Sequence, residues 1–227
     1  MPRRMPEPLS AENPPEKPKL LVIAGPNGSG KTTFTKQLLG HHWSDDCVFI
    51  NPDIIAEREF GGWNDQASIL KAADRAAELR EECLRTRTSM VVETVLSMED
   101  KVDFLRRAQE NGFFVRVFFI GTDTPEINAA RVTRRMIEGG HEVPINKILA
   151  RYFRSMRLCV SAGLISDRLY VHDNSFDGEN PVLLFRKHDG EFYKTYPGLN
   201  KHWWAEEIFR ELRKLKKLET VSSASDN

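Results

Sequence analysis

The segment at residues 25–32, GPNGSGKT, constrains the fold of this chain more than any other feature. Two glycines, Gly25 and Gly30, precede a lysine and a threonine, and the apolar run at residues 20–24 comes directly before them. A loop of this kind between a strand and a helix turns its backbone N–H groups toward phosphate oxygens, and the helix dipole adds positive potential. The alternative is a glycine-rich turn between strand and helix with an incidental lysine, and the complete match of glycines, lysine and threonine in this place favours phosphate binding over it. The sequence therefore predicts a phosphate-binding loop.

This loop supplies most of the candidate nucleotide-binding residues. We expect Lys31 to reach the β and γ phosphates of ATP and the hydroxyl of Thr32 to bind Mg²⁺, so ATP and magnesium are the predicted cofactors. The predicted ATP-binding residues of the loop are Gly25, Pro26, Asn27, Gly28, Ser29, Gly30, Lys31, Thr32 and Thr33. Enzymes, switches and motors share such a loop, so it does not define a reaction by itself.

Short apolar runs alternate with longer amphipathic ones along the chain, which is typical of a parallel sheet covered by helices. The predicted strands lie at residues 20–24, 48–51, 90–93, 114–120 and 168–171. The predicted helices lie at residues 31–39, 54–60, 67–86, 101–109, 125–137, 144–164 and about 203–218. Residues 182–187 and 191–195 flank a His-Asp-Gly turn and predict a small C-terminal hairpin. The expected fold is an α/β domain of the P-loop NTPase type, its parallel sheet sandwiched by helices, with a helical lid and a C-terminal hairpin and helix.

Composition indicates how the chain is divided into domains, where the protein is located and which partners it binds. Six of the twelve prolines lie in residues 1–18, which predicts a flexible leader before one domain at residues 19–220. The short, polar segment at residues 221–227 predicts a disordered tail. The three cysteines are odd in number and widely spaced, which indicates reduced thiols, and no apolar run suits a membrane span or secretory signal. We therefore expect a cytoplasmic protein. Thirty-three basic and thirty-three acidic side chains cancel, which argues against nucleic acid and membranes as partners.

Two acids follow predicted strands, at the edge of the sheet where ligands bind in this architecture. Asp53, in the sequence Asn51-Pro52-Asp53, is a candidate general base for a substrate hydroxyl, and on position alone it would serve equally well as a helix cap. Glu93 ends an apolar run, so its carboxylate needs a partner to offset desolvation. Binding magnesium through water, positioning a substrate and capping the next helix are the alternatives for Glu93.

Arginines gather on two consecutive predicted helices. Arg131 and Arg135 are four residues apart, Arg151 and Arg154 three apart, and a glycine-containing turn at residues 139–144 joins the helices. The pattern predicts a lid at about residues 125–158 that closes over ATP, since arginine binds two phosphate oxygens at once. Arg134 is expected to be a surface charge. For His141, in the turn, a structural role is favoured over a substrate contact.

Taken together, these motifs resemble the zeta-toxin family of P-loop kinases. The segments that carry the resemblance are, in order, GPNGSGKTT, FINPD with IIAER, VVETVLS, NAARVTRR and GGHEVPINKILARYFRS, spanning about residues 19–174. The resemblance implies an ATP-dependent kinase that phosphorylates a hydroxyl of a small molecule. The best-known members phosphorylate UDP-N-acetylglucosamine and some are held inactive by an antitoxin, so a nucleotide-sugar substrate and an antitoxin partner are implied as well.

The resemblance also assigns roles to individual residues. The catalytic aspartate of the family corresponds to Asp53 and its substrate-positioning glutamate to Glu93. Lys31, Arg135 and Arg151 are expected to act in catalysis with Asp53, and Arg131 and Arg154 to contact ATP. The expected substrate-binding residues are Asn51, Asp53, Glu93, Thr94, Ser97 and His141. Members that act on the nucleotide sugar usually have Gly-Thr after this glutamate, whereas Thr94 and Val95 stand here, so a substrate hydrogen bond is absent and the acceptor stays open.

Two other functions share part of this pattern. In a regulatory module ATP would close the lid and a partner would read the result, but such a module has no need of an acid opposite the loop. A polynucleotide end kinase would share both the loop and the aspartate, but the neutral net charge and the lack of a broad basic groove in the sequence weigh against it.

Overall fold

A single seven-stranded sheet forms the centre of the computed structural model, which describes residues 17–62, 65–138, 143–188 and 192–225. The strand order is β2-β3-β1-β4-β5-β6-β7; the first five are parallel, and β6 and β7 join antiparallel. The strands are β1 (Lys19–Ala24), β2 (Val48–Ile50), β3 (Met90–Thr94), β4 (Phe114–Gly121), β5 (Arg168–Asp173), β6 (Val182–His188) and β7 (Phe192–Thr195).

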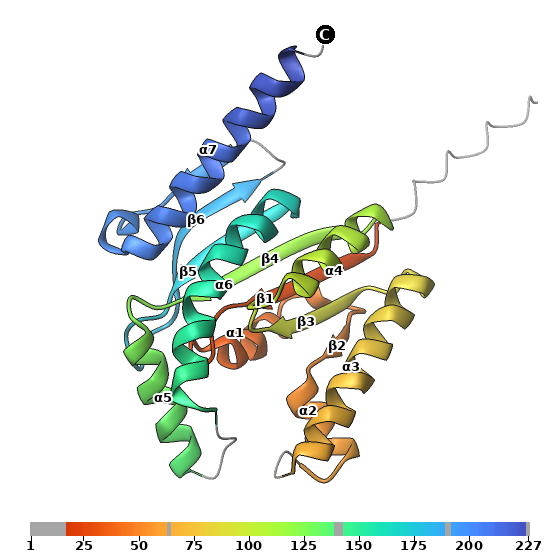
Figure 1. Cartoon of the computed structure of the whole chain (residues 1–227). Helices are drawn as coiled ribbons and strands as arrows, with labels where there is room; N and C mark the ends of the chain where they lie inside the picture. Colours follow the sequence, from red (N-terminus) through yellow and green to blue (C-terminus); the bar gives the residue numbers. More distant parts are fainter. Residues whose placement is uncertain (1–16, 63–64, 139–142, 189–191, 226–227) are drawn as a thin grey trace, which may run out of the picture.

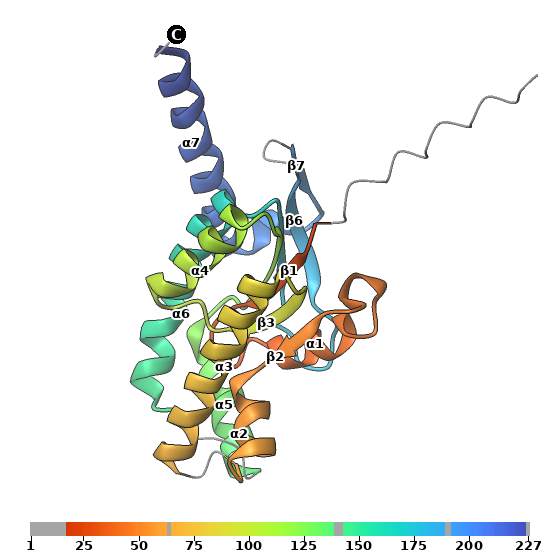
Figure 2. The same cartoon turned by 90° about the vertical axis from the view of Figure 1, so that its right-hand side faces the viewer.

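Helices lie on both sides of this sheet. They are α1 (Lys31–Leu38), α2 (Pro52–Glu59), α3 (Gln66–Thr86), α4 (Glu99–Glu110), α5 (Pro125–Ile137), α6 (Ile145–Ile165) and α7 (Trp203–Ser225), with the short 3₁₀ helices η1 (His42–Ser44) and η2 (Leu199–Lys201). Helices α3, α4, α6 and α7 cover one face, and α1 lies on the other (Figures 1 and 2). The predicted fold class, with its C-terminal hairpin and helix, is confirmed.

The core has two layers because β1 and β4 are buried on both faces. Leu20, Val22 and Phe119 face the larger cluster under α3, α4, α6 and α7, while Leu21 and Phe118 face the smaller one on the α1 side. Residues on both faces of β1 are therefore apolar, which explains its continuous apolar run. Within the described residues no helix is long and apolar enough to cross a membrane.

Most predicted boundaries lie within two residues of the observed ones, and the largest difference is at the C-terminus. Helix α7 continues to Ser225, so the expected helix end near residue 218 is wrong and the first five residues of the predicted tail are helical. Polar and small residues allow a helix to continue without marking its end, because the segment has neither glycine nor proline to stop it. The predicted leader, apart from residues 17 and 18, lies outside the described residues.

Candidate active site

The loop at residues 25–30 runs from the end of β1 to the start of α1, where the phosphate-binding pattern places it. Gly25, Gly28 and Gly30 have φ angles of 148°, 77° and 93°. A Cβ at these positions would lie 2.1 Å from Ile120 O, 2.5 Å from Asn128 O and 2.2 Å from Asn174 Nδ2, respectively. Glycine is therefore required both by the backbone conformation and by the close approach of β4, α5 and the loop after β5.

Two polar groups, in the loop and at the start of α1, are buried with no carboxylate in contact with them in the described part of the chain. The Lys31 ammonium donates a 2.9 Å hydrogen bond to Pro26 O. Burial lowers the pKa of Lys31 from 10.5 to about 8, although Glu93 and Asp53 act in the opposite direction. The hydroxyl of Ser29, fully buried, has no hydrogen-bond partner among the described residues. A buried cation beside an unpartnered donor fits the triphosphate of ATP.

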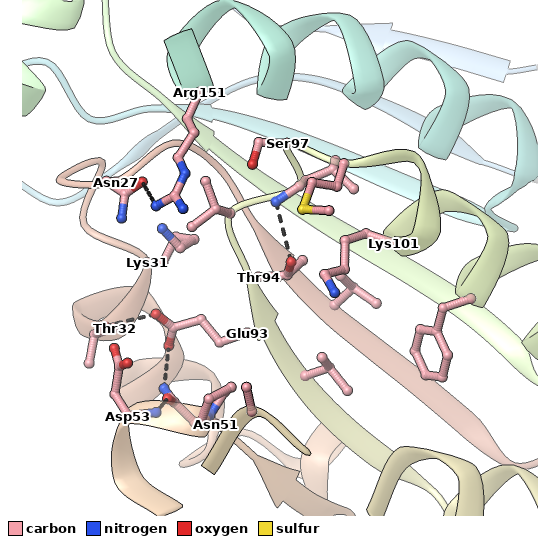
Figure 3. Close-up of a pocket in the computed structure, with 18 of the residues that line it drawn as sticks. Asn27, Lys31, Thr32, Asn51, Asp53, Glu93, Thr94, Ser97, Lys101 and Arg151 are labelled. Carbon is pink, nitrogen blue, oxygen red and sulfur yellow. Dashed lines mark hydrogen bonds between the residues drawn. The ribbon is translucent and has the colours of Figure 1, made fainter. Parts of the chain in front are cut away.

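Glu93 projects from the end of β3 toward the start of α1 (Figure 3). One carboxylate oxygen accepts a 2.8 Å hydrogen bond from Thr32 Oγ1, and the other accepts bonds from Thr35 Oγ1 at 3.1 Å and Asn51 Nδ2 at 3.2 Å. These donors offset the desolvation of the carboxylate. The alternative that Glu93 caps the next helix is wrong, because α4 begins after Met98 and has no side-chain cap. A threonine hydroxyl beside a carboxylate is a set of hard oxygen ligands, which fits Mg²⁺.

Asp53 lies in the first turn of α2, across from Thr32 (Figure 3). The cap of this helix is Asn51, whose side chain accepts a 2.9 Å hydrogen bond from Asp53 N, and Pro52 occupies the first helical position. The alternative that Asp53 caps the helix is therefore wrong. Its carboxylate is exposed, lines the pocket and makes no hydrogen bond within the described part of the chain.

Two of the predicted arginines face the loop. Arg135 and Arg151 line the same pocket as Lys31, and both lower the pKa of that lysine. Arg151 donates a long, 3.4 Å hydrogen bond to Asn27 Oδ1. Arg131 lines the pocket as well, but its guanidinium binds Asp177 Oδ1 and, at 2.7 Å, Asn174 O.

Other predicted site residues lie elsewhere. Arg154 is exposed and does not line the pocket, so nothing supports its expected contact with ATP. On α6 the residue that lies beside the site after Arg151 is Ser155, four residues later, and not Arg154, three residues later. Ser155 donates a 2.7 Å hydrogen bond to Val95 O. Arg134 is exposed and pairs with Asp177 at 3.1 Å, as a surface charge should. His141 lies outside the described residues.

Two asparagines hold the loop in place, and neither is among the site residues predicted from the sequence. Asn128, fully buried at the start of α5, donates a 2.6 Å hydrogen bond to Asn27 O and accepts one from Thr122. Asn174, after β5, donates a 2.8 Å hydrogen bond to Ser29 O. The sequence places Asn128 four residues before the apolar Val132, on the same face of the helix, but this spacing alone does not distinguish a contact with the loop from a solvated side chain.

A continuous pocket of about 820 Å³ begins at the loop and extends past Glu93 into the space between α3 and α4. Thr94 and Ser97, both expected to bind substrate, line its middle, and Lys101 lies beyond Thr94 as seen from the loop (Figure 3). The residues that line its far part include Ala73, Ala77, Arg80, Val92, Lys101, Phe104 and Leu105. The pocket therefore has room for a second molecule next to a bound nucleotide.

The parallel sheet, the glycine loop between β1 and α1 and the arginine-bearing helices α5 and α6 define a P-loop kinase fold. Residues 8–162 match the family model described as Zeta toxin, and the chain belongs to that family. The predicted family is therefore confirmed.

Individual relatives are distant. An uncharacterized protein of Haemophilus influenzae is 29% identical over 136 residues, which cover 59% of this chain and 92% of that protein. The structure of the AvrRxo1-ORF1:AvrRxo1-ORF2 complex with ATP has a TM-score of 0.57 at 20% identity, covering 85% of this chain and 63% of the matched one. The match thus spans less than two thirds of that longer chain. A chain of the PezAT toxin-antitoxin system of Streptococcus pneumoniae has a TM-score of 0.53 at 16% identity, covering 88% and 87%.

Proposed function

We propose that this protein is an ATP-dependent kinase that transfers the γ-phosphate to a hydroxyl group of a small molecule. The observation that carries the proposal is one pocket lined by Lys31, Asp53 and Glu93, with the space between α3 and α4 opening from it. The ATP complex of AvrRxo1-ORF1:AvrRxo1-ORF2, a structure with a similar fold, supports ATP as the nucleotide.

Each residue of the site has a role in this reaction. The loop N–H groups and Lys31 bind the β and γ phosphates, and Arg135 and Arg151 neutralise charge on the phosphoryl group as it moves. Thr32 and Glu93 would hold Mg²⁺, which neutralises phosphate charge when bound. The Asp53 carboxylate takes the proton from the acceptor hydroxyl. The oxygen of that hydroxyl bonds to the γ phosphorus, while the bond between the γ phosphorus and the oxygen that bridges to the β phosphate breaks.

The lid assigned to residues 125–158 fits the packing only in part. Val132, Val143 and Ile148 form a small core of their own between α5 and the start of α6. Tyr152 belongs instead to the main core, and its hydroxyl donates a 2.6 Å hydrogen bond to Thr122 O. We therefore infer that the moving part of the lid ends before Tyr152. Its closure would bring Arg135 and Arg151 into contact with the phosphates of ATP.

The acceptor is a small molecule that fits between α3 and α4, with a nucleotide sugar as one candidate. A hydroxyl-bearing ligand there would meet Thr94 and Ser97 and the apolar wall of Val92 and Phe104. A partner protein that restrains the kinase is also part of the proposal, because AvrRxo1-ORF1 was crystallised with AvrRxo1-ORF2 and PezAT is a toxin-antitoxin system.

Incubation with γ-labelled ATP, Mg²⁺ and a panel of nucleotide sugars, nucleosides and small sugars tests this function. We expect label on one class of acceptor, competed by excess unlabelled acceptor. Tight ATP binding without label on any acceptor, combined with nucleotide-dependent binding of a protein partner, would favour the regulatory module instead.

A further inference from the structure

A row of basic side chains crosses the face of the sheet on which α1 lies, away from the phosphate-binding loop. We call Arg116, Arg168, Arg186 and Lys194, on β4, β5, β6 and β7, the basic face. Arg116 lies opposite Arg168, and Arg186 opposite Lys194. Arg186 also lies opposite Tyr170, two residues from Arg168 and so on the same side of β5. Four neighbouring strands therefore present four cations on one face.

These cations have no acidic counterpart within the described structure. None of the four makes an ion pair there. The Nε atoms of Arg116, Arg168 and Arg186 are buried without a hydrogen-bond partner, and the Arg116 side chain belongs to a residue that is only 9% exposed. Burial is the main reason why the pKa of Arg116 is lowered; Tyr170 raises this pKa, and the adjacent Arg168 lowers it by less than Tyr170 raises it. Like charges opposite one another destabilise a sheet, so this arrangement calls for a ligand.

Aromatic rings lie between the cations. The Arg116 guanidinium is 4.1 Å from the centre of the Trp43 ring, the Arg168 guanidinium is 5.5 Å from that of Phe114, and the Lys194 ammonium is 5.3 Å from that of Tyr196. Stacking against a ring orients a guanidinium and leaves its N–H edge to bind an anion.

The basic face is accessible at its middle and its end. Arg168 and Arg186 are half-buried and Lys194 is exposed. Helices α3, α4, α6 and α7 lie on the other side of the sheet (Figure 2). On the near side α1 follows the phosphate loop at the carboxyl ends of the strands, whereas Arg116 and Arg168 lie near the amino ends of theirs.

We propose that the basic face binds the phosphate backbone of a single-stranded nucleic acid. Adjacent strands are about 4.8 Å apart, so the three accessible cations on β5, β6 and β7 extend over roughly 10 Å, which suits two or three successive phosphates. Alternating cations and aromatic rings on an open sheet are the chemistry by which proteins bind single strands, since phosphates pair with the cations and bases stack on the rings. The zero net charge, from which we expected no nucleic-acid partner, does not prevent local binding of this kind.

Binding of a fluorescent 20-nucleotide oligo(U) to the full chain, measured by anisotropy over a range of salt concentrations, tests this inference. We expect the affinity to fall steeply with salt. The Arg168→Gln/Arg186→Gln variant should bind at least tenfold more weakly, with a salt slope shallower by about 1.4, at about 0.7 per lost phosphate contact. Arg106→Gln, an exposed arginine on α4, is the matched control and should bind like the unmodified protein.

Lys194→Gln guards against misfolding of the double variant, because this side chain is exposed, and should reduce the slope by about 0.7. The proposal is overturned if the protein does not bind the oligonucleotide, if the variants bind with unchanged slope, or if polyglutamate competes equally well, which would identify an acidic protein as the partner. The inference does not depend on the kinase reaction: the double variant should transfer phosphate normally, and Asp53→Asn should bind the oligonucleotide normally.

Discussion

At the scale of single residues, the chemistry of the site centres on Lys31. Its ammonium is buried and, among the residues that the structure describes, has one hydrogen bond, to the carbonyl of Pro26. Glu93 and Asp53 favour its charged form through space, without a hydrogen bond to it. The lysine that the pattern assigned to phosphate binding is thus partly deprotonated in the free protein near pH 8. Lys31 could be predicted from the sequence because its role depends on its position after the glycine loop. Its lowered pKa could not be predicted, because that depends on burial, which the sequence does not specify.

ATP binding should therefore take up protons near pH 8. Phosphates beside the ammonium raise the pKa of Lys31 from about 8, so affinity should fall as the pH rises through 8 and stay constant well below it. Calorimetry at pH 8 in two buffers of different ionisation enthalpy would report uptake of about half a proton, and the same titration at pH 6 is the control. Equal apparent enthalpies in both buffers at pH 8 would contradict this view of Lys31.

At the scale of elements, the sequence predicted the strands and helices around the loop well, since their apolar periods and the loop chemistry agree. It did not separate Asn51 from Asp53 as the cap of α2, because both residue types cap helices and only the geometry shows whose side chain turns back. It also placed Arg154 on ATP, whereas Ser155 lies beside the site. Contacts between elements, such as that of Asn128 with the loop, leave no periodic signal in the sequence.

Asn128→Ala should destabilise the phosphate-binding loop, because it removes the contact between the start of α5 and that loop. The change leaves Asn27 O without its donor and Thr122 without its acceptor, which costs about 1–3 kcal/mol in the free energy of unfolding. ATP affinity should fall as well, as read by titration with a fluorescent ATP analogue. Thr133→Ala, an exposed change on the same helix, is the control; equal behaviour of the two variants would argue against a role for Asn128 in holding the loop.

At the scale of the whole molecule, α7 connects the C-terminal end of the fold to the site. Trp204, 1% exposed, packs against Gly121 at the end of β4, and Trp203 Nε1 donates a 2.9 Å hydrogen bond to Asp123 O. The next residue after Gly121 is Thr122, which bonds to Asn128 and so reaches the loop. The sequence predicted a helix at about residues 203–218 but not its packing, because Trp204 and Gly121 lie far apart in the chain.

Gly121→Ala should destabilise the protein through α7. An added Cβ would lie 2.4 Å from the Trp204 ring, and such overpacking of a buried site costs about 1–3 kcal/mol. Thermal unfolding measures the effect. Gly40→Ala, where the nearest atom to a new Cβ is Gln37 O at 3.5 Å, is the matched control, and an equal midpoint for the two variants would show that α7 does not pack as described.

The most direct test of the central claim, that Asp53 is the base of a phosphate transfer held by Lys31, compares two variants with the acceptor found by the label assay. In Asp53→Asn we expect ATP affinity to remain within about twofold and transfer to fall by about 10²–10⁴. In Lys31→Ala both ATP binding and transfer should be lost. Normal transfer by Asp53→Asn, with its ATP affinity unchanged, would contradict the account.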